Sequence, residues 1–192
     1  QSARVSMKRL KNPNSKVSCH YLIDRNGHIY KMIDDAKIAW HAGKSKWKNI
    51  KNLNKYSIGI EIQNKGHFIN YQNFPKKQIS SLIVLIKSLL KKYKIKKNNV
   101  LGHSDIAPER KKDPGEKFPW KNLAKEGLCT WHTLSKKDLK NTRKIRISYK
   151  YQNIFLKNLY KIGYNPIRGQ SLKINQKKLT MAFQRRYRQE LV

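Results

Sequence analysis

The sequence predicts a mixed α/β fold, in which helices flank a central sheet, followed by a small helical module. Segments rich in β-branched and aromatic residues occur at 17–33 and 57–62, and a long amphipathic segment follows at 78–93. Strands arranged around a long amphipathic helix are typical of a mixed α/β domain. Two shorter helical patterns close the chain.

The first strands are expected to form a β-hairpin. Residues 17–23 (VSCHYLI) and 28–33 (HIYKMI) are strand-like, and the Asn26-Gly27 pair between them tolerates the positive φ of a tight turn. Residues 57–62 (SIGIEI) alternate and are rich in Ile, which predicts a further strand.

The longest helix is predicted at 78–93. Its apolar residues at 79, 82, 83, 86, 89, 90 and 93 fall on one helical face. After a break at Asn98-Asn99, residues 100–103 (VLGH) are interpreted as a short strand that ends at a histidine. Residues 104–120 are interpreted as a long irregular loop.

The chain is expected to contain two units. The first covers residues 1–131, and a linker at 132–150 includes the charged stretch SKKDLKNTRK. Helical patterns at 151–162 and 173–190 then form a module over 151–192, in which two helices alone would make a thin core.

The composition limits the classes of partner. A net charge of +33 attracts polyanions, but the lysines are dispersed and no nucleic-acid motif is present. We therefore expect no specific nucleic-acid partner and rank a DNA-binding function last. No segment approaches the roughly 20 apolar residues of a membrane span. Cys19 and Cys129 could form a disulfide or remain free thiols.

Several residues could perform chemistry. His103 and Asp113 carry groups that bind zinc well, and Lys111 could stabilise an oxyanion beside them. The alternative is a capped turn with a surface ion pair. Glu61 lies on a mostly apolar strand, so it either acts as a general base or points outward from an edge strand.

The other histidines are weaker candidates. Trp40 and His41 share a loop and could contact a substrate, although a loop histidine is often incidental. His20 lies within a strand and is expected to be a hydrogen-bonded core residue rather than a ligand. The remaining histidines, His28, His67 and His132, are expected on the surface.

Six motifs occur in order along the chain: VSCHYL (17–22), AWHAG (39–43), SIGIE (57–61), GHSDIAP (102–108), RKKDPG (110–115) and FPW (118–120). Together they resemble the N-acetylmuramoyl-L-alanine amidases of the amidase-2 family. That family shares a fold with the peptidoglycan recognition proteins and phage T7 lysozyme. The resemblance covers about residues 3–131, and the C-terminal segment is similar to the peptidoglycan-binding helical module of the AmiD branch.

The resemblance implies a zinc-dependent hydrolase. His103 and Asp113 match two of three zinc ligands, Glu61 matches the base, and Lys111 matches the lysine that stabilises the tetrahedral intermediate. The loop with Trp40 and His41 would border the substrate groove. The substrate would be peptidoglycan or muropeptides, cut between the lactyl group of N-acetylmuramic acid and L-alanine.

One position departs from the family pattern. The first zinc ligand of the family is a histidine on an earlier strand, and the sixteen residues before Val17 contain none, so we expect the third ligand upstream of Gln1. The chain alone would then be weakly active, or an inactive peptidoglycan-binding relic. The resemblance implies the periplasm or cell envelope, with the cytoplasm as the alternative. Membrane anchoring is expected only through a preceding segment.

Overall fold

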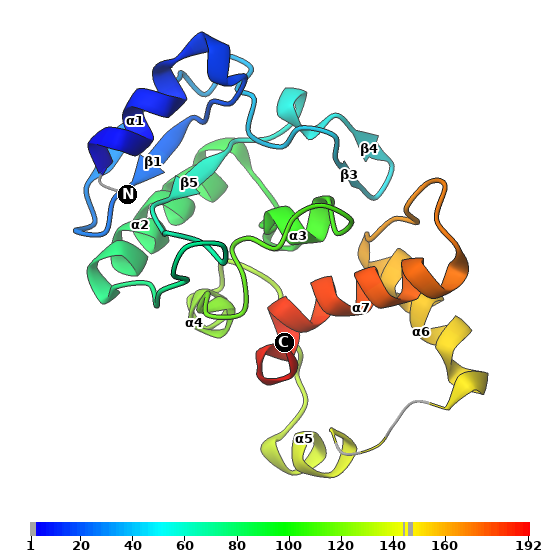
Figure 1. Cartoon of the computed structure of the whole chain (residues 1–192). Helices are drawn as coiled ribbons and strands as arrows, with labels where there is room; N and C mark the ends of the chain where they lie inside the picture. Colours follow the sequence, from blue (N-terminus) through cyan, green and yellow to red (C-terminus); the bar gives the residue numbers. More distant parts are fainter. Residues whose placement is uncertain (1–2, 144, 146–147) are drawn as a thin grey trace.

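The computed structural model describes residues 3–143, 145 and 148–192. It is a mixed α/β structure in which a small sheet packs on a long helix, and further helices gather at the C-terminal end of the chain (Figure 1). The fold class expected from the sequence is therefore confirmed.

The main sheet contains β2 (Ile29–Lys31), β1 (Tyr21–Ile23) and β5 (Ile60–Ile62), in that order. β1 runs antiparallel to β2, as expected for the hairpin, and parallel to β5. Leu22 on β1 is in register with Glu61 on β5. The strands are shorter than predicted, and within the described residues β5 lies at one edge of this sheet.

The long helix α2 (Lys76–Tyr93) covers one face of this sheet and forms the first hydrophobic core (Figure 1). Ile79, Leu82, Ile86 and Leu89 are buried on the face that the sequence pattern predicts. The helix starts after Pro75, and Lys94 with φ of 50° ends it in the left-handed conformation.

The C-terminal helices do not form a separate thin core. α6 (Tyr149–Ile162) and α7 (Leu172–Tyr187) contribute Leu156, Leu159 and Leu179 to a second cluster. Trp47 and Leu53, from the first half of the chain, belong to the same cluster. The helices thus obtain buried apolar area by packing on the preceding domain.

Two expectations about local structure were wrong. Residues 100–102 form no strand, because side chains rather than a neighbouring strand bind this backbone: Arg186 Nη2 donates to the Val100 carbonyl at 3.0 Å. His103 instead begins the short helix α3 (His103–Ile106), so 104–120 is not wholly irregular. The charged stretch contains α5 (Lys136–Thr142), which Ser135 caps by accepting from the Asp138 N–H.

The remaining elements are short. They are α1 (Ala3–Lys11), η1 (Pro13–Ser15), β3 (Lys46–Trp47), β4 (Ile50–Lys51), η2 (Leu53–Lys55), η3 (Lys97–Asn99), α4 (Trp120–Lys125) and η4 (Gln189–Leu191). Cys19 and Cys129 are both buried as free thiols. Among the described helices, none combines the length and apolarity needed to cross a bilayer.

Candidate active site

A depression of about 360 Å³ collects most of the residues singled out by sequence. Trp40, His41, His103 and Lys111 all line it, and they come from segments far apart in the chain. The sequence analysis did not anticipate several neighbours that line it as well, namely Lys16, Val17, Gly43, Asn54 and Arg110.

His103 and Asp113 meet directly. His103 Nδ1 lies 3.0 Å from Asp113 Oδ2, and its Nε2 lies 3.1 Å from the Ala42 carbonyl oxygen. Partial burial alone would raise the pKa of Asp113. The hydrogen bond from His103 and the charges of His103 and Lys111 have the larger combined effect, and they lower this pKa. The carboxylate is therefore charged at neutral pH.

Glu61 lies in the electrostatic field of the same group. Its residue is exposed on β5, which lies at the edge of the sheet within the described residues, as the outward-pointing alternative expects. Desolvation of its carboxyl by nearby protein atoms, followed by the charge of Asp113, raises its pKa. His103 and Lys111 act on that pKa in the opposite direction. Glu61 is therefore close enough to Asp113, His103 and Lys111 for their charges to act on its pKa, although it does not line the depression.

Arg110 is a residue that the sequence analysis did not select. Its guanidinium donates to the carbonyl oxygens of Ala42 and Lys44, with Nη2 at 2.8 Å from the latter. The same Nη2 lies 3.5 Å from His103 Nε2. Arg110 therefore ties the loop at 42–44 to the segment that carries His103. Its place beside Lys111 in the RKKDPG motif was the available signal.

His41 is held in a neutral, packed position. Its Nε2 lies 3.2 Å from the Ser57 carbonyl oxygen, and its ring packs edge-on against His20 with 5.5 Å between centroids. Burial, then the charges of His20 and His103, lower the pKa of His41 to about 4. Because Nε2 donates to the Ser57 carbonyl, the neutral imidazole leaves Nδ1 to accept a hydrogen bond from a substrate.

His20 is a satisfied core histidine, as expected. Its Nδ1 accepts from the Gly59 N–H at 3.0 Å, which leaves Nε2 as the donor to the Lys37 carbonyl at 3.0 Å. Trp40, in contrast, is 54% exposed beside the depression. Its open ring face is available for stacking on a sugar.

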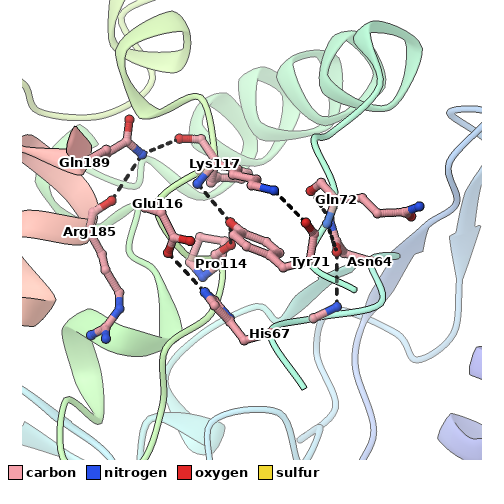
Figure 2. Close-up of polar contacts among 11 residues, drawn as sticks. Asn64, His67, Tyr71, Gln72, Pro114, Glu116, Lys117, Arg185 and Gln189 are labelled. Atoms are coloured by element: carbon pink, nitrogen blue, oxygen red, sulfur yellow. Dashed lines mark hydrogen bonds and ion pairs between the residues drawn. The ribbon is translucent and has the colours of Figure 1, made fainter. Parts of the chain in front are cut away.

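A network around Tyr71 fixes the loop that carries Asp113 (Figure 2). Tyr71 donates to the Pro114 carbonyl at 2.6 Å, and the Lys117 N–H donates to the Tyr71 hydroxyl at 3.0 Å. His67 is exposed, as expected, and it stacks on Tyr71 and pairs with Glu116 at 3.0 Å. The network holds the loop residues on both sides of Gly115 in place.

The donor atoms fit zinc in kind, but not in number. Imidazole and carboxylate are common zinc ligands, whereas a catalytic site usually has three protein ligands. Within the described part of the chain, no group of three or more His, Cys, Asp or Glu residues is placed to hold a metal. Coordination by His103 through Nδ1 would also replace its hydrogen bond to Asp113.

Comparison with known proteins identifies relatives of one kind. Residues 1–116 match the family model Amidase_2, described as N-acetylmuramoyl-L-alanine amidase. The chain is 41% identical over 130 residues to Escherichia coli AmiD, an N-acetylmuramoyl-L-alanine amidase. It is 42% identical over 106 residues to Haemophilus influenzae AmpD, a 1,6-anhydro-N-acetylmuramyl-L-alanine amidase. These segments cover 62% and 55% of this chain and 47% and 55% of the relatives, so the chain spans about half their length.

Solved structures of similar proteins cover the C-terminal helices as well. Escherichia coli AmiD, in complex with anhydro-N-acetylmuramic acid-L-Ala-D-gamma-Glu-L-Lys, superimposes with a TM-score of 0.85 at 31% identity. Pseudomonas aeruginosa AmpDh3 superimposes with a TM-score of 0.86 at 31% identity. Each match covers 99% of this chain, and 77% and 80% of the respective structure.

Proposed function

Because the chain belongs to the N-acetylmuramoyl-L-alanine amidase family, we propose that it hydrolyses the amide between the lactyl group of N-acetylmuramic acid and L-alanine in peptidoglycan fragments. The observation that supports this proposal is the contact of His103 with Asp113 at 3.0 Å, at a depression that Lys111 also lines. AmpDh3 has also been solved with an anhydromuramic pentapeptide, which favours a substrate of this class here.

Each residue has a role that follows from its chemistry. Glu61, whose raised pKa makes it a better proton acceptor than an ordinary glutamate, takes the proton of the attacking water. Lys111 lines the depression and stabilises the negative charge on the carbonyl oxygen. Trp40 and His41 orient the sugar and the lactyl group at the rim.

The cofactor of the proposed reaction would be zinc, and His103 and Asp113 would hold it in part. When bound, zinc polarises the scissile carbonyl and lowers the pKa of a water. Because those two residues alone supply fewer ligands than a catalytic zinc site normally has, we expect weak zinc binding by this chain. A competition titration with a chromophoric chelator measures it, and His103→Ala should abolish what binding there is.

A second candidate function is recognition of peptidoglycan without hydrolysis. The direct hydrogen bond between His103 and Asp113 favours it, since this pairing occupies the atoms that a metal would need. Such a protein would keep the depression with Trp40 and His41 but would release no peptide.

Digestion of purified sacculi and of anhydromuropeptides separates the two functions. The chain is incubated with zinc or with a chelator, and released peptides are identified by mass spectrometry. Release of peptides that begin with L-alanine, dependent on zinc and lost in Glu61→Gln, supports the amidase. The matched control Glu109→Gln removes a carboxylate from the neighbouring loop and should release peptide normally. Co-sedimentation with sacculi without peptide release would favour the binding function.

A further inference from the structure

Asp105 connects the C-terminal helices to the segment that carries His103. It lies in α3, is 1% exposed, and its Oδ1 accepts from the Tyr164 hydroxyl at 2.5 Å. Its Oδ2 accepts from Arg186 Nη1 at 2.7 Å and from the Gly102 N–H at 2.8 Å. Tyr164 follows α6 and Arg186 lies on α7, so both anchors of this carboxylate come from the last 30 residues of the chain.

Arg186 has little freedom to move. It is 3% exposed, and its Nη2 donates to the Val100 carbonyl at 3.0 Å. Its guanidinium carbon lies 4.1 Å from the centroid of the Trp120 ring. A buried charge that loses such partners is strongly penalised, so one arrangement of these groups is preferred. In Figure 1, α7 accordingly lies beside α3.

The Asp105 carboxylate also fixes the backbone at Gly102, the residue before His103. Gly102 is the N-cap of α3, and Asp105 closes the cap by accepting the Gly102 N–H. His103 is the first residue of the helix, and the next residue, Ser104, donates its N–H to the Asp113 carbonyl at 2.9 Å. A shift of Asp105 would therefore turn α3 and move His103 relative to Asp113.

We propose that Tyr164 and Arg186 are positioning residues, which hold His103 opposite Asp113 by fixing Asp105. The C-terminal helices are then a structural part of the reaction centre, in addition to any binding they contribute. The effect on catalysis rests on the proposed amidase function. The position of His103 can nevertheless be measured whether or not the chain hydrolyses peptidoglycan.

Two variants and a matched control test this role. Tyr164→Phe removes the hydroxyl but keeps the ring that packs edge-on against Trp47, and Arg186→Lys keeps the charge but loses the forked geometry. The control Tyr160→Phe removes a hydroxyl from a half-buried tyrosine of α6. The ¹⁵N signals of the His103 imidazole report its contact with Asp113, and hydrolysis of an anhydromuropeptide gives kcat and KM separately.

We expect Tyr164→Phe and Arg186→Lys to shift or broaden the His103 signals and to lower kcat about tenfold, with KM changed much less, as for one lost hydrogen bond. Tyr160→Phe should change neither. Unshifted His103 signals in folded Tyr164→Phe would overturn the positioning role. A wild-type chain without hydrolysis would overturn the proposed function instead, and would leave the imidazole signals as the test of positioning.

Native-state hydrogen exchange on the unmodified chain covers the case in which a variant does not fold. If α7 anchors α3, the Ser104 amide should become exchangeable in the same opening event as Leu179 and Ala182, with the same denaturant dependence. Opening of α7 at low denaturant that leaves the Ser104 amide protected would overturn the coupling.

Discussion

The buried pair of Asp105 and Arg186 makes a strong prediction about stability. In Asp105→Asn, an amide NH₂ replaces one carboxylate oxygen, so Arg186 or Tyr164 loses its acceptor while the volume is kept. Breaking a buried ion pair by removing one partner costs about 3–5 kcal/mol. For a chain of this size, roughly 2–4 °C per kcal/mol corresponds to a fall of about 6–20 °C in Tm.

A double-mutant cycle isolates the pair itself. The cycle combines Asp105→Asn with Arg186→Met, and urea unfolding gives the free energy of each variant. The double variant should be less destabilised than the sum of the single variants, because it leaves no unpaired buried charge. The matched control is the pair of Lys87 and Glu126, whose side chains are 51% and 44% exposed.

The control cycle should give a coupling of about 1 kcal/mol or less, as surface pairs do. A coupling between Asp105 and Arg186 that is as small as this would refute the reasoning. It would mean that water reaches the pair or that the α7 contact with α3 is not maintained in solution. The same result would weaken the positioning role of Arg186.

Three further predictions concern other parts of the molecule. Gly59→Ala should destabilise the fold by about 1–3 kcal/mol in urea unfolding and displace His41, because a Cβ at this position would lie 2.2 Å from the His41 ring; an unchanged unfolding midpoint would contradict this. Burial alone would raise the pKa of Asp35, but hydrogen bonds led by those from Tyr21 and Tyr93 lower it to about 2, so the stability it adds above its unfolded pKa should be lost as the pH falls from about 4 towards 2. Thermal melts of Asp35→Asn should lack this part of the acid dependence, and a melt profile parallel to that of wild type would contradict it. Glu61→Gln should lower hydrolysis by about 10²–10⁴ and remove an acid limb that lies above the usual pKa of a glutamate, and a pH–rate profile that keeps this limb would exclude Glu61 as the base.

Local sequence patterns were sufficient to predict several of the main helices and strands. The alternating segment that contains β5 and the apolar face of α2 were evident because strand and helix periodicity are local properties. The helical patterns near the C-terminus likewise correspond to α6 and α7. The strand expected at 100–103 failed because the conformation there depends on Arg186, whose contact with Val100 could not be seen in a local pattern.

The sequence alone proposed the chemical groups of the candidate site. The resemblance of the ordered motifs to the amidase-2 family singled out Glu61, His103, Lys111 and Asp113, whereas the residue types alone left a structural alternative open for each. Their roles in catalysis stay predictions. Only the tertiary structure showed that the side chains of His103 and Asp113 form a hydrogen bond with each other.

Only the tertiary structure decided what the end of the chain does. Asp105 appeared in the sequence as one residue of a loop, and Arg186 as one of many basic residues in a chain of charge +33. Their contact joins positions 81 residues apart, and no local pattern distinguishes a buried arginine from a solvated one. The distinction arises from packing, because the loss of one partner of an ion pair destabilises the fold strongly only when the fold excludes water from both charges.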